Sequence, residues 1–209
     1  MSQVNKNLIS YFEKQIFPQY KHNEEGHGIE HIKTVLHRSV QIVEHHHLDI
    51  NINMLYTAVG YHDIGHHINP SIHEKISANL FTQDIYLQAF FTHKESQIIQ
   101  QAIEDHRASL KKEPRNLYGK ILSTADRDTS VPELFKRVYE YRLHHVPNAS
   151  LTERIEEAYI HIQEKFWDTW YAKVYLKDEA YENFLVEVRT LLADKEAFTQ
   201  TFKSLNNIK

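Results

Sequence analysis

The stretch LYTAVGYHDIG, residues 55–65, places two ionisable residues at the end of an apolar run. With helical periodicity, His62 falls on the same face as Leu55 and Val59, and Asp63 follows Val59 on that face. A buried carboxylate is costly unless a positive partner meets it, and a metal ion bound by His62 and Asp63 would be such a partner. The stretch therefore predicts a helix that ends at a buried metal site.

The composition suits a globular chain with a sizeable core. Of its 209 residues, 41% are hydrophobic and 25% are charged. The formal net charge of -4 gives no broad basic surface, so we expect no nucleic acid duplex as a partner. There is no cysteine, which excludes a disulfide, a thiolate zinc site and a thiol nucleophile.

The sequence also bears on location. No stretch is long and apolar enough to span a bilayer, and residues 1–20 lack the apolar block of a signal peptide. We therefore expect no membrane partner and a cytoplasmic location, although the absence of cysteine permits other compartments.

Helical periodicity recurs along nearly the whole chain, while glycine is scarce and runs of alternating Val, Ile and Thr are missing. We expect an all-α fold. Capping boxes beginning at Ser71 and Thr92 mark two helix starts. Gly65 would suit the left-handed backbone conformation in which many helices end. The predicted helices span residues 4–17, 29–46, 53–65, 71–81, 92–107, 117–127, 131–146, 152–175 and 178–205.

Further polar side chains lie near helix ends, on or beside an inward-facing apolar stripe. They are His31, His73, His106 and Asp126. With His62 and Asp63 they make six groups from five predicted helices that can converge on one buried point.

Imidazole and carboxylate ligands suit a divalent transition metal such as Mn, Fe, Co, Ni or Zn, and Mg is also compatible. Without thiolates, a closed structural zinc site is disfavoured. Mixed nitrogen and oxygen ligands fit a catalytic site, where a metal lowers the pKa of a water and polarises a phosphoryl oxygen. Six groups exceed what one hydrolytic ion normally takes from a protein, so both one ion and two ions stay open.

The order of these residues resembles the HD-domain superfamily of metal-dependent phosphohydrolases. The resemblance is carried by GHGIEHIKTVLHRS at 26–39, LYTAVGYHDIGHH at 55–67 and STADRD at 123–128. It implies a first metal held by His31, His62, Asp63 and Asp126. Many members add histidines for a second metal or for the substrate phosphate, and SIHEKISA at 71–78 and IEDHRASL at 103–110 supply His73 and His106 there.

The chain lacks the motifs that distinguish several subfamilies of the superfamily. HDIGH at 62–66 resembles the deoxynucleotide triphosphohydrolases, but the rest of their extended motif does not follow. The Gly-Tyr-Pro signature of cyclic di-nucleotide phosphodiesterases and the Glu-Asp pair of alarmone hydrolases are absent. The match is closest to small stand-alone bacterial members with unassigned substrates. It implies one all-helical domain over 1–209, with a helical-bundle core at about 26–141 and additional C-terminal helices at about 151–205 packed on it.

The resemblance implies hydrolysis of a phosphomonoester, nucleotide or phosphodiester by an activated water. Asp63 would bridge a second ion and orient the nucleophile, while His73 and His106 would bind that ion or neutralise the developing oxyanion. His66 is our candidate for the leaving-group acid. Cations that could bind the substrate phosphate follow His106 or neighbour Asp126; they are Arg107, Lys111 and Arg127.

Other interpretations stay open. His62, Asp63 and Asp126 could be helix-end caps or partners in a buried salt bridge to an arginine. His73 could be a surface residue of a capping turn, and His106 a hydrogen-bonded core residue. The whole chain could be a non-catalytic metal- and nucleotide-binding sensor domain, or a helical scaffold without metal. A homodimer is also compatible with the aromatic residues near 166–171.

Overall fold

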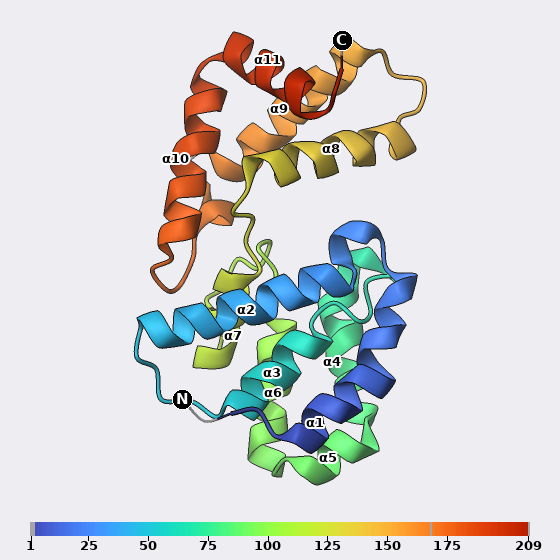
Figure 1. Ribbon diagram of the computed structural model, residues 1–209, viewed down its shortest axis with the longest axis vertical. Helices are drawn as coiled ribbons and strands as arrows, with labels where there is room; N and C mark the ends of the chain where they lie inside the picture. Colours follow the sequence, from blue (N-terminus) through green and yellow to red (C-terminus); the bar gives the residue numbers. More distant parts are fainter. Residues whose placement is uncertain (1–2, 168, 209) are drawn as a thin grey trace. The chain divides into compact units, whose positions relative to one another are not determined.

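The computed structural model describes residues 3–167 and 169–208, which form helices joined by turns and loops (Figure 1). No β-strand occurs among these residues, so the all-α prediction is confirmed. The chain divides into two compact units. The first ends at Asp126 and also takes in Val174–Lys177; the second comprises Arg127–Lys173 and the chain from Asp178 onward. The boundary thus falls before the core limit of about 141 that we expected, and packing of the C-terminal helices on the core stays a prediction.

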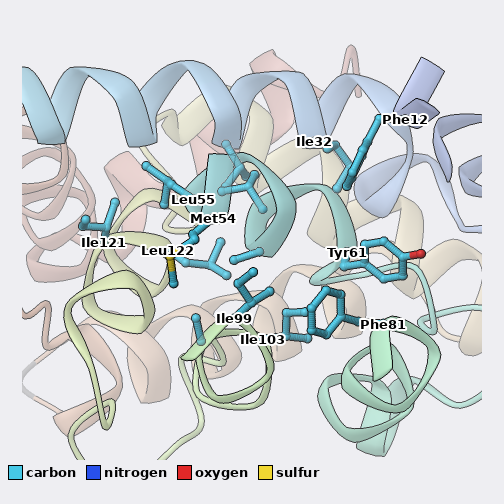
Figure 2. Packing of buried hydrophobic residues seen from close by; sticks show 14 of the residues in the cluster. Phe12, Ile32, Met54, Leu55, Tyr61, Phe81, Ile99, Ile103, Ile121 and Leu122 are labelled. Atoms are coloured by element: carbon cyan, nitrogen blue, oxygen red, sulfur yellow. The ribbon is translucent and has the colours of Figure 1, made fainter. Parts of the chain in front are cut away.

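The first unit is built around one buried helix. Its helices are α1 (Lys6–Tyr11), α2 (Ile29–His45), α3 (Ile52–Tyr61), α4 (His73–Gln83), α5 (Ile85–Phe90), α6 (His93–Glu104) and α7 (Leu117–Ala125). Helix α3 is apolar on almost every side, which is typical of a helix enclosed by others. It contacts α2, α4, α6 and α7, and Figure 2 shows Leu55 of α3, Ile99 of α6 and Leu122 of α7 in the shared core.

Local capping fixes where several of these helices begin. Asn51 caps α3 and Asn116 caps α7, and Thr92 forms the expected capping box at the start of α6. The capping box that we expected at Ser71 is wrong. Residues Pro70–Ile72 form a 3₁₀ turn, and α4 begins at His73.

The left-handed conformation expected at Gly65 is also wrong, because no described glycine has a positive φ. Helix α3 ends at Tyr61, and turns follow to Ile68. A Cβ atom on Gly65 would lie 2.6 Å from Ile76 Cγ2 on α4, and the Gly65 N–H donates to Ser77 Oγ at 3.0 Å. Glycine is needed here because the turn that carries the His62-Asp63 pair packs directly on α4.

The segment before α2 is less regular than the predicted helix 4–17. Helix α1 continues as a π-helical stretch, Phe12–Ile16, and then as 3₁₀ turns at Phe17–His22 and Glu25–His27. These turns carry the chain past the end of α3, since Tyr20 donates to the Gly60 carbonyl at 2.9 Å.

The second unit contains α8 (Val131–His145), α9 (Leu151–Phe166), α10 (Glu179–Ala193) and α11 (Lys195–Leu205). Its core includes Phe135, Phe198 and Phe202, whose ring centroids lie 4.9 to 5.7 Å apart. The predicted helix 152–175 ends early, at Phe166, and the predicted helix 178–205 is interrupted at Asp194, which caps α11. Among the described residues, no helix has the length and apolar character needed to cross a membrane.

Candidate metal centre

Four of the predicted ligands meet in the first unit. His31 comes from the first turn of α2, His62 and Asp63 from the end of α3, and Asp126 from the end of α7. His31 Nε2 lies 3.1 Å from Asp126 Oδ1 and 3.6 Å from Asp63 Oδ2. His62 Nε2 lies 3.5 Å from Asp63 Oδ2 and 3.7 Å from Asp126 Oδ1.

These separations suit ligands of a common ion. Two ligand atoms each about 2.1 Å from a metal are about 3.0 Å apart at a right angle and about 3.4 Å apart at a tetrahedral angle. The Nε2 atoms of His31 and His62 are buried and make no hydrogen bond. Buried polar atoms normally have partners, so the arrangement is well suited to a cation among these four side chains.

A second group of imidazoles faces the other oxygen of Asp63. His73 Nε2 lies 3.1 Å from Asp63 Oδ1, and His106 Nε2 lies 3.5 Å from it. The two Nε2 atoms are 3.0 Å apart. Asp63 is only 2% exposed, and its carboxylate lies between the two groups, with one oxygen toward each.

Main-chain carbonyls orient three of the imidazole rings. The Nδ1 atom of His62 lies 2.7 Å from the Val59 carbonyl, and that of His106 lies 2.6 Å from the Ile103 carbonyl. His73 Nδ1 makes the same contact, at 2.9 Å, to a carbonyl three residues earlier. A carbonyl only accepts, so each Nδ1 donates, and a neutral ring then directs its Nε2 lone pair into the cluster.

The charges favour a bound cation. Burial alone would raise the pKa of Asp63 and Asp126, but the charge of His62 and the neighbouring imidazoles hold both values well below the usual range. Burial alone would lower the pKa of His62, but Asp63 and Asp126 raise it to about 9. In the chain without metal, a proton on His62 thus partly balances two ionised carboxylates.

The pKa values of His73 and His106, the histidines of the second group, are shifted in opposite directions. Burial tends to lower the pKa of both rings, but for His73 the neighbouring Asp63 carboxylate outweighs burial and raises the pKa. For His106, which is 1% exposed, burial prevails and the pKa is lowered. The two Nε2 atoms lie 3.0 Å apart, so the titrations of the two rings are coupled.

Two residues that sequence reasoning missed also reach this centre. His27, in the turn before α2, places its Nδ1 atom 2.7 Å from Asp63 Oδ2. Asn23 donates from Nδ2 to the carbonyls of His27 and Asp63, at 2.9 and 2.8 Å. Both lie outside regular helix, where apolar periodicity gives no signal. The one available hint was the spacing of four residues between His27 and His31.

His66 and Arg107 lie close to the second group. The His66 ring stacks on His27 with centroids 3.8 Å apart, and burial, followed by the charge of His27, lowers its pKa to about 4. The Arg107 guanidinium donates to Glu74 at 3.0 Å and to the Ser71 carbonyl at 2.6 Å. Its charge acts to lower the pKa of both His66 and His73.

The other predicted phosphate-binding cations lie elsewhere. Lys111 is exposed in the loop after α6. Arg127 belongs to the second unit, where it donates to the Lys173 carbonyl at 3.3 Å and faces the Tyr171 ring. A role for Lys111 or Arg127 at the metal centre stays a prediction.

The fold and the site define a class of protein: an all-helical unit in which helix ends bring imidazoles and carboxylates together in a cluster that fits metal binding. Residues 28–130 match the family model of the HD domain. The chain therefore belongs to the HD-domain superfamily, and the resemblance inferred from the sequence is confirmed. Comparison with curated proteins and with solved structures gave no match.

The matched segment contains both imidazole groups and both carboxylates of the centre, from His31 to Asp126. It begins after Asn23 and His27.

Proposed function

We propose that this chain is a metal-dependent phosphohydrolase that acts on a phosphomonoester, a nucleotide or a phosphodiester. The observation that carries the proposal is the division of the Asp63 carboxylate between two sets of imidazoles, at separations of 3.1 to 3.6 Å. A carboxylate that bridges two ions is a recurrent feature of sites that hydrolyse phosphate esters.

In this proposal, His31, His62 and Asp126 hold a first divalent ion together with Asp63. His73 and His106, together with Asp63, would hold a second ion. When bound, such ions lower the pKa of a water and polarise a phosphoryl oxygen. The ligand set suits Mn, Fe, Co, Ni or Zn, with Mg as a further alternative.

We assign to Arg107 the role of binding the substrate phosphate. Its guanidinium is held by Glu74 and a main-chain carbonyl at the start of α4, beside His73. A planar guanidinium donates two parallel hydrogen bonds to phosphate oxygens, so this placement suits an anion bound at the second group. Lys111 and Arg127 remain further candidates from the sequence.

His66 is assigned a hydrogen-bonding role at the substrate. With a pKa lowered to about 4, its ring is neutral near pH 7. A neutral imidazole of such low basicity is a poor proton donor to a leaving group, which argues against our expectation that His66 is the leaving-group acid.

The test uses protein stripped with a chelator and reloaded with Mn²⁺. We expect hydrolysis of an aryl phosphate, an aryl phosphodiester or a nucleotide only after reloading. Asp63→Asn should abolish turnover while the circular dichroism spectrum is retained. Asp49→Asn, at an exposed aspartate, is the matched control. Full activity in Asp63→Asn would overturn the proposal.

The same experiment distinguishes the alternative of a non-catalytic sensor. Tight stoichiometric nucleotide binding, without turnover over a broad panel of substrates, would favour that alternative. The cytoplasmic location inferred from the sequence is a further proposal, which cell fractionation tests. The homodimer is another, which size-exclusion chromatography tests.

A further inference from the structure

The Asp63 carboxylate must be held in one plane if it is to serve two sets of ligands. The final torsion of an aspartate side chain is soft, so its carboxylate plane is set by its hydrogen-bond partners. Asp63 Oδ1, the oxygen facing His73 and His106, is buried and makes no hydrogen bond. Whatever fixes the plane must therefore act on Oδ2.

The side chain that contacts Oδ2 most closely is His27. The separation of 2.7 Å between His27 Nδ1 and Asp63 Oδ2 is that of a direct hydrogen bond. It is shorter than the separation of about 3.0 Å between two ligands at a right angle on one ion. Because an ionised carboxylate only accepts, His27 Nδ1 donates. One lone pair of Oδ2 then remains for the side of His31 and His62.

The position of His27 is itself fixed from two sides. The Asn23 amide donates to the main-chain carbonyls of both His27 and Asp63, so one side chain ties the two residues together. Asn23 Oδ1 accepts from the His67 N–H at 3.0 Å, which secures the turn after α3. On its other side, the His27 ring stacks on His66 at an interplanar angle of 19°.

We propose that His27 is a positioning residue, which fixes the Asp63 carboxylate through Oδ2 and so presents Oδ1 to the second imidazole group. This role rests on the proposed metal-dependent function. The His27 side chain is 34% exposed, compared with 23% for the proposed ligand His31 and 0% for His62. His27 thus lies toward the rim of the centre, and its 2.7 Å contact with Oδ2 makes Asp63 the residue through which it acts.

Isosteric variants separate a hydrogen-bond donor from a metal ligand. Asparagine places an amide N–H close to where Nδ1 stands, whereas aspartate places only an acceptor there. We expect His27→Asn to bind Mn²⁺ within about threefold of the wild-type affinity by calorimetry. His27→Asp and His27→Ala should weaken binding roughly 10- to 100-fold, as loss of a supporting partner of a ligand does. His93→Asn, at an exposed histidine of α6, is the matched control.

Thermal unfolding of each metal-free variant shows whether it is folded. Asn23→Ala approaches the same question with His27 intact, and it should weaken Mn²⁺ binding in the same way. If His27→Asp binds as tightly as wild type while His27→Asn loses an ion, His27 is a ligand and the proposal is overturned. Wild-type affinity in every variant would also overturn it, whereas absence of Mn²⁺ binding by the wild-type chain would overturn the proposed function itself.

Discussion

The Nε2 atoms of His73 and His106 lie 3.0 Å apart, and the Nδ1 atom of each ring faces a main-chain carbonyl. With both Nδ1 atoms donating, two lone pairs face each other unless a cation lies between them. In the proposed enzyme that cation would be a metal ion, held by His73, His106 and Asp63.

This relationship predicts that the two ions can be removed separately. Asparagine in place of either histidine keeps an N–H toward the carbonyl and lacks the Nε2 ligand. His106→Asn and His73→Asn should therefore each lose the second ion, with roughly 100-fold weaker binding there, and keep the first. His62→Asn should lose the first. Elemental analysis of dialysed protein measures the stoichiometry: each variant should hold one ion where the wild-type chain holds two. A variant that keeps the wild-type metal content would contradict the assignment.

A second prediction concerns pH. The pKa of His62 is raised to about 9, so its proton stabilises the metal-free fold fully below about pH 6.5, and this stability is lost as pH rises through about 9. A metal needs the deprotonated Nε2 atom. Mn²⁺ affinity should therefore increase between pH 6.5 and 9 and then level off.

Calorimetry measures this linkage at pH 7. Mn²⁺ binding should release the His62 proton, so the observed heat should differ between two buffers of different ionisation enthalpy. Equal heats in both buffers, together with an affinity that does not change with pH, would show that His62 is not protonated in the metal-free centre.

The sequence was sufficient to predict much of this centre. His62, Asp63 and Asp126 follow apolar residues at helical spacing, and His31 precedes an apolar stripe. The structure brings all four side chains together. Such periodicity works because a helix repeats its faces regularly, so a polar residue in an apolar stripe must face the interior.

Non-helical features could not be predicted in this way. Asn23 and His27 lie in turns whose geometry is set by partners far along the chain, including the carbonyl of Asp63. The break at Asp194 also escaped detection, because neither proline nor glycine interrupts the sequence there and the aspartate caps the next helix instead.

Gly65 gives a third prediction. Because a Cβ atom there would lie 3.0 Å from the main-chain nitrogen of Ser77 as well as close to Ile76, Gly65→Ala should push the turn away from α4. We expect a loss of about 1–3 kcal/mol in the free energy of unfolding, and weaker metal binding because the same turn carries Asp63.

Gly119→Ala serves as the comparison in urea unfolding. Its Cβ would meet Pro114 Cβ at 3.0 Å, and alanine gains about 1 kcal/mol of helix propensity within α7. This variant should keep wild-type metal affinity. If Gly65→Ala were as stable as wild type, the close packing of the turn on α4 would be refuted.

A fourth prediction concerns Arg107. Arg107→Ala should leave the metal content unchanged and raise KM for a phosphate ester roughly 10-fold, which corresponds to about 1.4 kcal/mol of lost charge-assisted hydrogen bonding. Steady-state kinetics and inhibition by inorganic phosphate measure the effect. Lys112→Ala, at an exposed lysine of the same loop, is the control. An unchanged KM would show that Arg107 does not bind the substrate phosphate.

The central claim is that Asp63 is shared between two ions, and anomalous diffraction from crystals soaked in Mn²⁺ tests it most directly. We predict two peaks about 3.5–4 Å apart, one beside His31, His62 and Asp126 and the other beside His73 and His106, with Asp63 between them. A single peak, or two peaks that Asp63 does not join, would contradict the account.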